Sequence, residues 1–256
     1  VVVDNGSTDA TVAAIRSTHA RLMTHPHRSP YRARNLAIEQ TESEFVAMTD
    51  ARCLAEPNWL FEMIRKAEET DAMLVGGLTV FELTKDSLGN RLFVETHQPD
   101  QMRAAIEQYS CVAGNNMLIR REAFERYGLF KTIRSGSDIE FSKRLAQNGH
   151  APVFAESAIV KRQCDLSNWA YLKRCYRIRF GQRMHSTKPT GIFAACSFAR
   201  CLPWRPGFRA GGSAAKECGS IREYFTQWIY RWATRWAAFF GEWHAALVAK
   251  KAVNER

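Results

Sequence analysis

Acidic side chains follow two apolar runs of the chain, at the points where strands would end. Asp4 follows the run VVV in the segment VVVDNGSTDAT, and Asp50 follows the run EFVAMT. Ligands of open α/β sheets bind at that edge, where a carboxylate accepts hydrogen bonds from a base N–H or a ribose hydroxyl and repels phosphate. Gly6 permits a tight turn, and Asp9 is one of the residues able to cap the next helix. The first segment therefore predicts either a ligand contact or a plain helix-capping turn.

Three further segments combine charged or amide side chains with apolar runs. They are RARNLAI at 32–38, GNNMLIRREAFERYGLF at 114–130 and GSDIEFSKRLAQNGH at 136–150. Asp138 stands where the last of these segments would begin a helix, so its carboxylate can cap that helix, act as a proton acceptor, or do both. Gly114 allows a backbone to approach a ligand closely.

Alternating strand and helix patterns surround these segments and indicate an α/β fold. Strand patterns cover 1–3, 44–49, 73–81, 117–120 and 152–154. Helical patterns begin near Thr11, at Pro57 and at Asp138, and Gly149 would end the last of them. Beyond residue 160, helices are expected at 167–184 and 221–249, separated by a stretch rich in Pro and Gly. We expect a catalytic domain at 1–160 and a helical extension at 161–256.

Charge is distributed unevenly along the 256 residues. Residues 1–160 hold 18 Lys and Arg against 21 Asp and Glu, whereas residues 161–256 hold 18 against 5. The second segment is strongly basic and suits an anionic partner such as nucleic acid, a membrane surface or a phosphorylated substrate. The seven cysteines form no CxxC pair, and no apolar run reaches the length of a spanning helix. Reduced thiols in the cytoplasm are the expectation, without a zinc site.

In their order and spacing, the five polar segments resemble the family-two glycosyltransferases. The family pattern runs DDGSTDGT, ARN-x-G, DADC-x-P-x-W, G-x-N-x-x-x-R-R and a helix that begins near the catalytic base; the corresponding segments here cover roughly residues 1–185. The resemblance implies a GT-A (Rossmann-like) mixed sheet flanked by helices, with a C-terminal helical extension. The family also has a strand before the first motif, and the chain begins without an initiator methionine, so we expect an N-terminal truncation.

The resemblance also implies roles for individual residues. Asp138 matches the general base of an inverting transfer from a nucleoside-diphosphate sugar to an acceptor hydroxyl. Such enzymes act on glycan or lipid-linked acceptors, and cell-envelope polysaccharide is the expected product class. The matched donor-binding positions are Asp4, Asp9, Arg34, Asp50, Gly114 and Asn116. For Arg34 a surface salt bridge is the alternative, and for Asn116 a turn-stabilising role.

Two positions depart from the family pattern. The second carboxylate of the DxD element, which binds Mg²⁺ or Mn²⁺, is replaced by Arg52, so only Asp50 is left as a metal ligand. A guanidinium binds phosphate oxygens in a bidentate manner, so Arg52 either replaces the ion at the donor or only pairs with Asp50 or Glu56 and marks a lost activity. Ser137 stands where many relatives have glutamate, but Asp138, which inversion requires, is retained.

Aromatic residues form one stripe along the predicted helix at 221–249. The stripe consists of Phe225, Trp228, Trp232, Trp236, Phe239 and Trp243, with arginines nearby. This combination suits a helix lying in the plane of a membrane, which would place the protein peripherally on its inner face. The alternative is that the stripe packs on the catalytic domain.

Two other classes of function remain as rivals. A nucleic-acid-binding protein would explain the basic segment but none of the five motifs, so no nucleic-acid partner is expected. A sugar-nucleotide-binding homologue without catalysis would explain Arg52.

Overall fold

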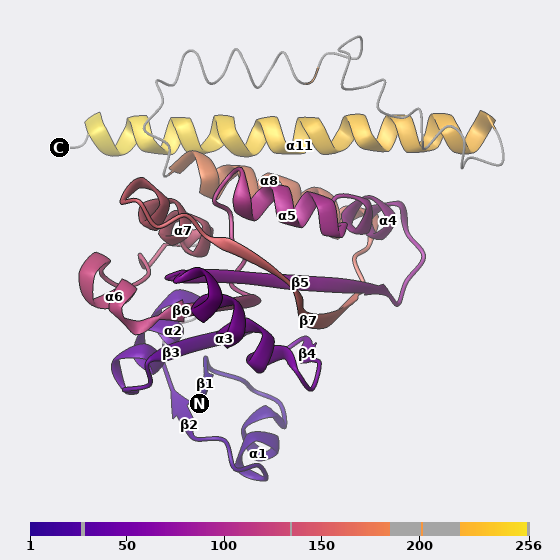
Figure 1. The fold of residues 1–256 in the computed structure, drawn as a ribbon. Helices are drawn as coiled ribbons and strands as arrows, with labels where there is room; N and C mark the ends of the chain where they lie inside the picture. Colours follow the sequence, from indigo (N-terminus) through magenta and orange to yellow (C-terminus); the bar gives the residue numbers. More distant parts are fainter. Residues whose placement is uncertain (27–28, 134, 185–200, 202–220, 255–256) are drawn as a thin grey trace. The chain divides into compact units, whose positions relative to one another are not determined.

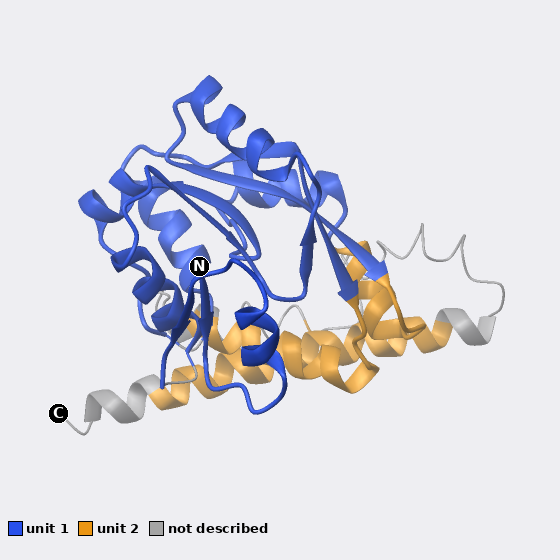
Figure 2. Ribbon diagram, turned by 90° about the horizontal axis from the view of Figure 1, so that it is seen from below, with its two compact units in different colours: residues 1–82, 97–163 blue, residues 83–96, 164–256 orange. Residues whose placement is uncertain are grey.

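The computed structural model describes residues 1–26, 29–133, 135–184, 201 and 221–254. Its contacts divide the chain into two compact units (Figure 2). Unit 1 comprises Val1–Glu82 and His97–Gln163, and unit 2 comprises Leu83–Thr96 and Cys164–Arg256. Residues 83–96 therefore group with the C-terminal segment, an arrangement that the sequence boundaries at 160 and 161 did not anticipate.

Unit 1 contains a five-stranded sheet and a two-stranded sheet (Figure 1). The strands of the larger sheet are β3 (Phe45–Thr49), β4 (Cys53–Ala55), β5 (Leu74–Leu83), β6 (Asn116–Arg120) and β7 (Val153–Cys164). In this sheet β6 is antiparallel to both β3 and β5, and β4 is antiparallel to β7. The pairing of Thr49 with Asn116 places the end of β3 beside the start of β6, so the residues that follow and precede these strands meet. The strand order of the larger sheet is β3, β6, β5, β7, β4. In the two-stranded sheet, β1 (Val2–Asp4) pairs in parallel with β2 (Leu22–Thr24).

Helices cover both faces of the larger sheet. Successive side chains of a strand point to opposite faces. Met117 of β6 belongs to one apolar cluster together with Phe141 of α7 (Ser137–Gln147). Leu118 belongs to another cluster together with Met63 of α3 (Trp59–Thr70). The predicted α/β class with a mixed, helix-flanked sheet is therefore confirmed. The helices of unit 1 are α1 (Thr11–Arg16), α2 (Pro30–Glu39), α3 (Trp59–Thr70), α5 (Pro99–Glu107), α6 (Arg121–Tyr127) and α7 (Ser137–Gln147).

Unit 2 is built from α4 (Leu88–Glu95), α8 (Asn168–Met184) and the long α11 (Ile221–Asn254). The helix α11 packs along α8, and the Tyr230 hydroxyl donates to the Asn168 carbonyl at 2.5 Å. An ion pair of 2.6 Å joins Arg231 of α11 to Glu95 of α4. Within the described ranges, no helix is both long enough and apolar enough to cross a bilayer.

The predicted elements agree with the structure in type, and several differ in extent. The last strand runs over Val153–Cys164 rather than 152–154, and the helix expected to begin at Pro57 begins at Trp59 because a turn occupies the two residues before it. The short strands β2 and β4 and the helices α4 and α5 were not predicted. Most of the Pro- and Gly-rich stretch at 201–220 lies outside the described residues.

Candidate functional site

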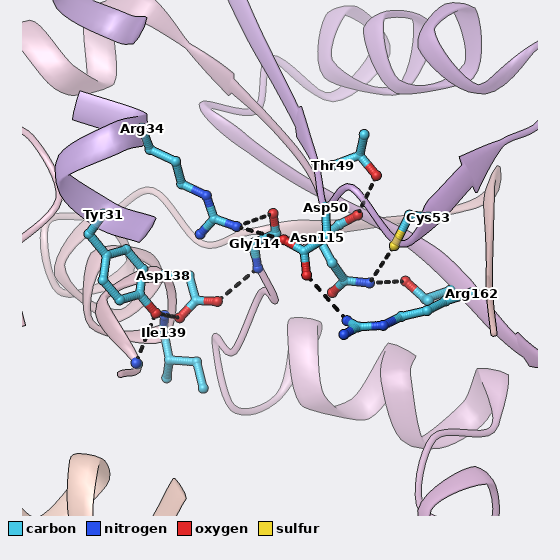
Figure 3. Close-up of polar contacts among 12 residues, drawn as sticks. Tyr31, Arg34, Thr49, Asp50, Cys53, Gly114, Asn115, Asp138, Ile139 and Arg162 are labelled. Atoms are coloured by element: carbon cyan, nitrogen blue, oxygen red, sulfur yellow. Dashed lines mark hydrogen bonds and ion pairs between the residues drawn. The ribbon is translucent and has the colours of Figure 1, made fainter. Parts of the chain in front are cut away.

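The backbone of one residue, Gly114, connects two of the carboxylates that the sequence singled out, Asp50 and Asp138 (Figure 3). Its N–H donates to Asp138 Oδ2 at 2.8 Å, and its carbonyl accepts from Arg34 Nη2 at 2.9 Å. The same Nη2 lies 3.1 Å from Asp50 Oδ1. The structure therefore brings together Arg34, Asp50, Gly114 and Asp138, which come from α2, the end of β3, the approach to β6 and the start of α7.

Only glycine fits at position 114 with this arrangement. A Cβ atom there would lie 2.3 Å from Arg34 Nη1 and 2.8 Å from Arg34 Cζ. Any side chain would therefore displace the guanidinium from its place between Asp50 and the Gly114 carbonyl. The close approach predicted for Gly114 is real, but the group that approaches is an arginine of the same chain.

Asp138 is held by more than its own helix. Oδ1 accepts from the Tyr31 hydroxyl at 3.0 Å and from the Ile139 N–H at 3.0 Å. Burial, and next the charge of Asp138, raise the pKa of Tyr31 to about 12, so the hydroxyl remains a protonated donor at neutral pH. Tyr31 lies three residues before Arg34 on α2, a spacing that brings both side chains to the same helix face. Sequence reasoning missed Tyr31, although this spacing was a usable signal.

Asp50 faces a second guanidinium. Arg162 Nη1 of β7 lies 3.2 Å from Asp50 Oδ2, while Oδ1 faces Arg34. Arg162 is brought there by the pairing of β4 with β7, in which it lies opposite Cys53. Because that pairing joins segments distant in sequence, no local pattern could have predicted the contact.

Arg52 lies exposed in the turn between Asp50 and β4. Of the two acidic partners proposed for it, Asp50 is in contact with Arg34 and Arg162, and Glu56 forms a 2.5 Å ion pair with Lys161. Both proposed partners therefore face other cationic side chains.

The residues around Asp50 do not fit a divalent-cation site. Both of its carboxylate oxygens face guanidinium groups, and a third cationic side chain replaces the second DxD carboxylate. In the part of the chain that the structure describes, no group of three His, Cys, Asp or Glu residues could hold a metal ion. The local charge that would meet an incoming cation is positive, which opposes its binding.

Asp4 and Asp9 stabilise the first turn of the chain. Asp4, at the end of β1, accepts from the N–H groups of Gly6 at 3.1 Å and Ser7 at 3.2 Å. Asp9 accepts from the Thr11 N–H at 3.0 Å, at the start of α1. Hydrogen bonds from Ser7 and from Thr11, respectively, lower the pKa of each carboxyl group. Within the described residues, no recorded contact joins either aspartate to Asp50 or Asp138.

Asn116 is not available to a ligand in this structure. Its side chain is buried, at 2% exposed, and both amide hydrogens are used, toward the carbonyls of Leu78 at 2.9 Å and Ala158 at 3.1 Å. Its Oδ1 accepts from Trp59 Nε1 at 2.8 Å. In this structure the amide has a structural role instead of the expected contact with a sugar, because it connects β6 to β5, to β7 and to α3.

Comparison with known proteins identifies the family. The family model for glycosyl transferase family 2 matches residues 1–128. Glycosyltransferase AglE of Haloferax volcanii is 27% identical over 166 residues, which cover 62% of this chain and 54% of that protein. The chain thus spans about half the length of this curated relative. A mannosyltransferase from Pyrobaculum calidifontis, solved with GDP-Man and Mn²⁺, shares the fold with a TM-score of 0.61 at 19% identity, over 93% of this chain and 76% of that one.

These matches confirm both the resemblance drawn from the five motifs and the predicted GT-A fold. The matched residues include Asp4, Asp9, Arg34, Asp50 and Gly114, and the structural match extends over most of the chain. The chain therefore belongs to glycosyl transferase family 2.

Proposed function

We propose that the protein is an inverting glycosyltransferase that moves a sugar from a nucleoside-diphosphate sugar to an acceptor hydroxyl, with Asp138 as general base. The observation that carries the proposal is the backbone of Gly114, whose N–H donates to Asp138 and whose carbonyl accepts from Arg34. Gly114 thus links Asp138, whose carboxylate can accept a proton, to the ion pair of Arg34 and Asp50. The resemblance to the family implies that Arg34 and Asp50 occupy donor-binding positions. Family membership supports the transfer chemistry.

The proposed step is a direct displacement. The acceptor oxygen forms a bond to the anomeric carbon while the bond from that carbon to the phosphate oxygen breaks, and the nucleoside diphosphate leaves with the electron pair. Asp138 takes the proton from the acceptor hydroxyl. Its carboxylate accepts hydrogen bonds from Tyr31, Gly114 and Ile139, which fix its orientation. Fixed orientation matters because attacking and leaving groups must lie in line.

Donor binding is assigned to Asp4, Asp9, Arg34, Asp50 and Gly114. The two N-terminal aspartates would contact the base or ribose, a role supported by their position after β1, at a sheet edge of the kind that binds ligands. Arg34 would support the nucleotide pocket, and Arg52 remains a candidate ligand of the donor phosphates. The Pyrobaculum mannosyltransferase was solved with GDP-Man, which supports a nucleoside-diphosphate sugar as the donor class.

Contact with a membrane surface, on its cytoplasmic side, is proposed for the segment 221–249. The helix α11 has large apolar side chains that are exposed, on a segment rich in arginine. These side chains recur at spacings of three, four and eleven residues, and they are Phe225, Ile229, Phe240, Trp243 and Leu247. A glycan or lipid-linked acceptor would suit an enzyme held at such a surface. Its product class would then be a cell-envelope polysaccharide.

Sugar-nucleotide binding without transfer is the second candidate function. It is favoured by Arg52, which replaces the carboxylate that relatives use to bind the metal. Hydrolysis of the donor, measured beside its binding, separates the two functions, because only the transferase turns the donor over.

The substitution Asp138→Asn tests the transferase directly. A donor is first selected from a panel of UDP-, GDP- and dTDP-sugars by the increase in melting temperature of the full chain. We expect Asp138→Asn to reduce turnover about 10²–10⁴-fold, the usual contribution of a general base, and to leave the donor Kd unchanged within a factor of about three.

The matched control is Asp71→Asn, because Asp71 is 99% exposed and its left-handed backbone conformation accepts asparagine. The control should transfer sugar at the wild-type rate. Near-normal turnover of Asp138→Asn would contradict the assignment of the base.

A further inference from the structure

The carboxylate of Asp50 lies between two guanidinium groups, and one of them has no assigned role. We propose that Arg162 binds the diphosphate of the sugar donor and supplies the positive charge that a metal ion would otherwise provide, so that transfer proceeds without a divalent cation. This inference rests on the proposed transferase function and names the group that stabilises its leaving diphosphate.

The contacts of the two arginines differ. Arg34 is engaged twice, by Asp50 and by the Gly114 carbonyl, and its side chain is 18% exposed. Arg162 contacts Asp50 through Nη1 alone among the recorded bonds, and its side chain is 24% exposed. A guanidinium carries five N–H donors in a planar fork that matches phosphate oxygens. Each arginine therefore uses one terminal nitrogen in these bonds, and Arg162, the more exposed of the two, has Nε and Nη2 to offer a ligand.

The positive charge next to Asp50 exceeds the single negative charge of its carboxylate. Its single negative charge faces the positive charges of both Arg34 and Arg162. The neighbouring acid, Glu56, forms its own ion pair with Lys161, which points to the opposite face of β7 from Arg162. The three side chains in direct contact, Asp50, Arg34 and Arg162, therefore carry a net positive charge, which is complementary to a diphosphate.

The same cluster explains the poor fit of a metal ion. A divalent cation needs carboxylate oxygens as ligands, but both Asp50 oxygens already face guanidinium groups and the second carboxylate position holds Arg52. Fixed positive groups in the site can instead stabilise the negative charge that appears on the diphosphate when its bond to the anomeric carbon breaks. The electron pair goes to the phosphate oxygen, and the acceptor proton goes to Asp138.

Binding of nucleotides in the presence of EDTA tests this inference without requiring activity. The probes are UDP and GDP, each compared with its monophosphate, added to the full chain and measured by titration calorimetry. The wild-type protein should bind one diphosphate at least about tenfold more tightly than its monophosphate, as expected when a charged hydrogen-bond donor meets the second phosphate. Arg162→Gln should remove that difference and leave the affinity for the monophosphate unchanged.

Two further variants serve as comparisons for Arg162→Gln. Arg162→Lys keeps the charge but loses the planar fork, so it should retain part of the preference. Arg65→Gln removes a guanidinium whose ion pairs with Glu62 and Glu69 are exposed on α3, and it should bind like the wild type. Circular dichroism of each variant verifies the fold.

The outcomes distinguish this inference from the proposed function. A diphosphate preference that requires Mn²⁺, is absent in EDTA and survives Arg162→Gln would overturn the inference alone and leave the transferase intact. If farnesyl diphosphate, a lipid diphosphate without a nucleoside, binds through Arg162 and neither UDP nor GDP binds, both proposals fail. Transfer that continues in EDTA and falls about 10–100-fold in Arg162→Gln would support both.

Discussion

The two units of the molecule use glycine in opposite ways. In unit 1, Gly114 makes room for a side chain, because a Cβ atom would lie 2.3 Å from the Arg34 guanidinium. In unit 2, Gly241 of α11 makes room for a backbone, because a Cβ atom would lie 2.2 Å from the Tyr176 carbonyl oxygen of α8. The first glycine positions a charged group beside Asp50, and the second only lets two helices pack closely.

The surrounding residues extend this contrast. Around Gly114, short hydrogen bonds and ion pairs connect four elements of unit 1. Around Gly241, α11 meets α8 through aromatic rings, as in Phe180 and His244, whose centroids lie 5.3 Å apart, and through an ion pair of Arg179 with Glu242. Polar networks of this kind fix individual atoms, whereas apolar packing holds whole helices together. We therefore assign chemistry to unit 1 and a supporting or surface-binding role to unit 2.

Of the two glycine substitutions, Gly114→Ala is expected to have the larger effect on activity. The added methyl group forces the Arg34 guanidinium away from Asp50 and from the carbonyl of residue 114, so kcat/KM should fall about 100-fold or more, as for misplaced catalytic groups. Steady-state transfer assays measure the loss.

The control for Gly114→Ala is Gly149→Ala, at a left-handed position with open space around it. That change should reduce stability by about 1–2 kcal/mol and leave kcat/KM unchanged. Equal losses of activity in both variants would remove the special role of Gly114.

A smaller effect on activity is expected from Gly241→Ala. Because backbone atoms cannot move aside as a flexible side chain can, the added methyl group should force α8 and α11 apart and destabilise unit 2 by about 1–3 kcal/mol. Urea unfolding followed by tryptophan fluorescence reports this unit, because six of the seven tryptophans lie in residues 164–256. Transfer to a water-soluble acceptor should stay within about twofold of wild type. A loss of kcat/KM as large as that of Gly114→Ala would contradict the assignment of chemistry to unit 1 and of a supporting role to unit 2.

Local patterns in the sequence were sufficient for the elements that carry the charged residues. An apolar run before Asp50 predicted β3, and an aspartate before an apolar stripe predicted α7, although the helix begins at Ser137 with Gly136 as its N-cap, so the capping role expected for Asp138 was wrong. These features depend on neighbours in sequence, so a single chain reveals them.

Features that depend on tertiary pairing were not predictable. Arg162 reaches Asp50 only because β4 pairs with β7, and residues 83–96 group with the C-terminal helices through contacts distant in sequence. Asn116 belongs to a motif that lines the donor site in relatives, yet its amide is used within the sheet. A motif identifies a residue type at a position, whereas the direction of the side chain is set by packing.

The configuration of the product tests the central claim most directly. The anomeric proton of the newly formed linkage is followed by ¹H NMR early in the reaction, with the donor that most raises the melting temperature. Displacement by an acceptor that Asp138 activates predicts a linkage of opposite configuration to the donor sugar. A product that keeps the configuration of the donor would contradict the account.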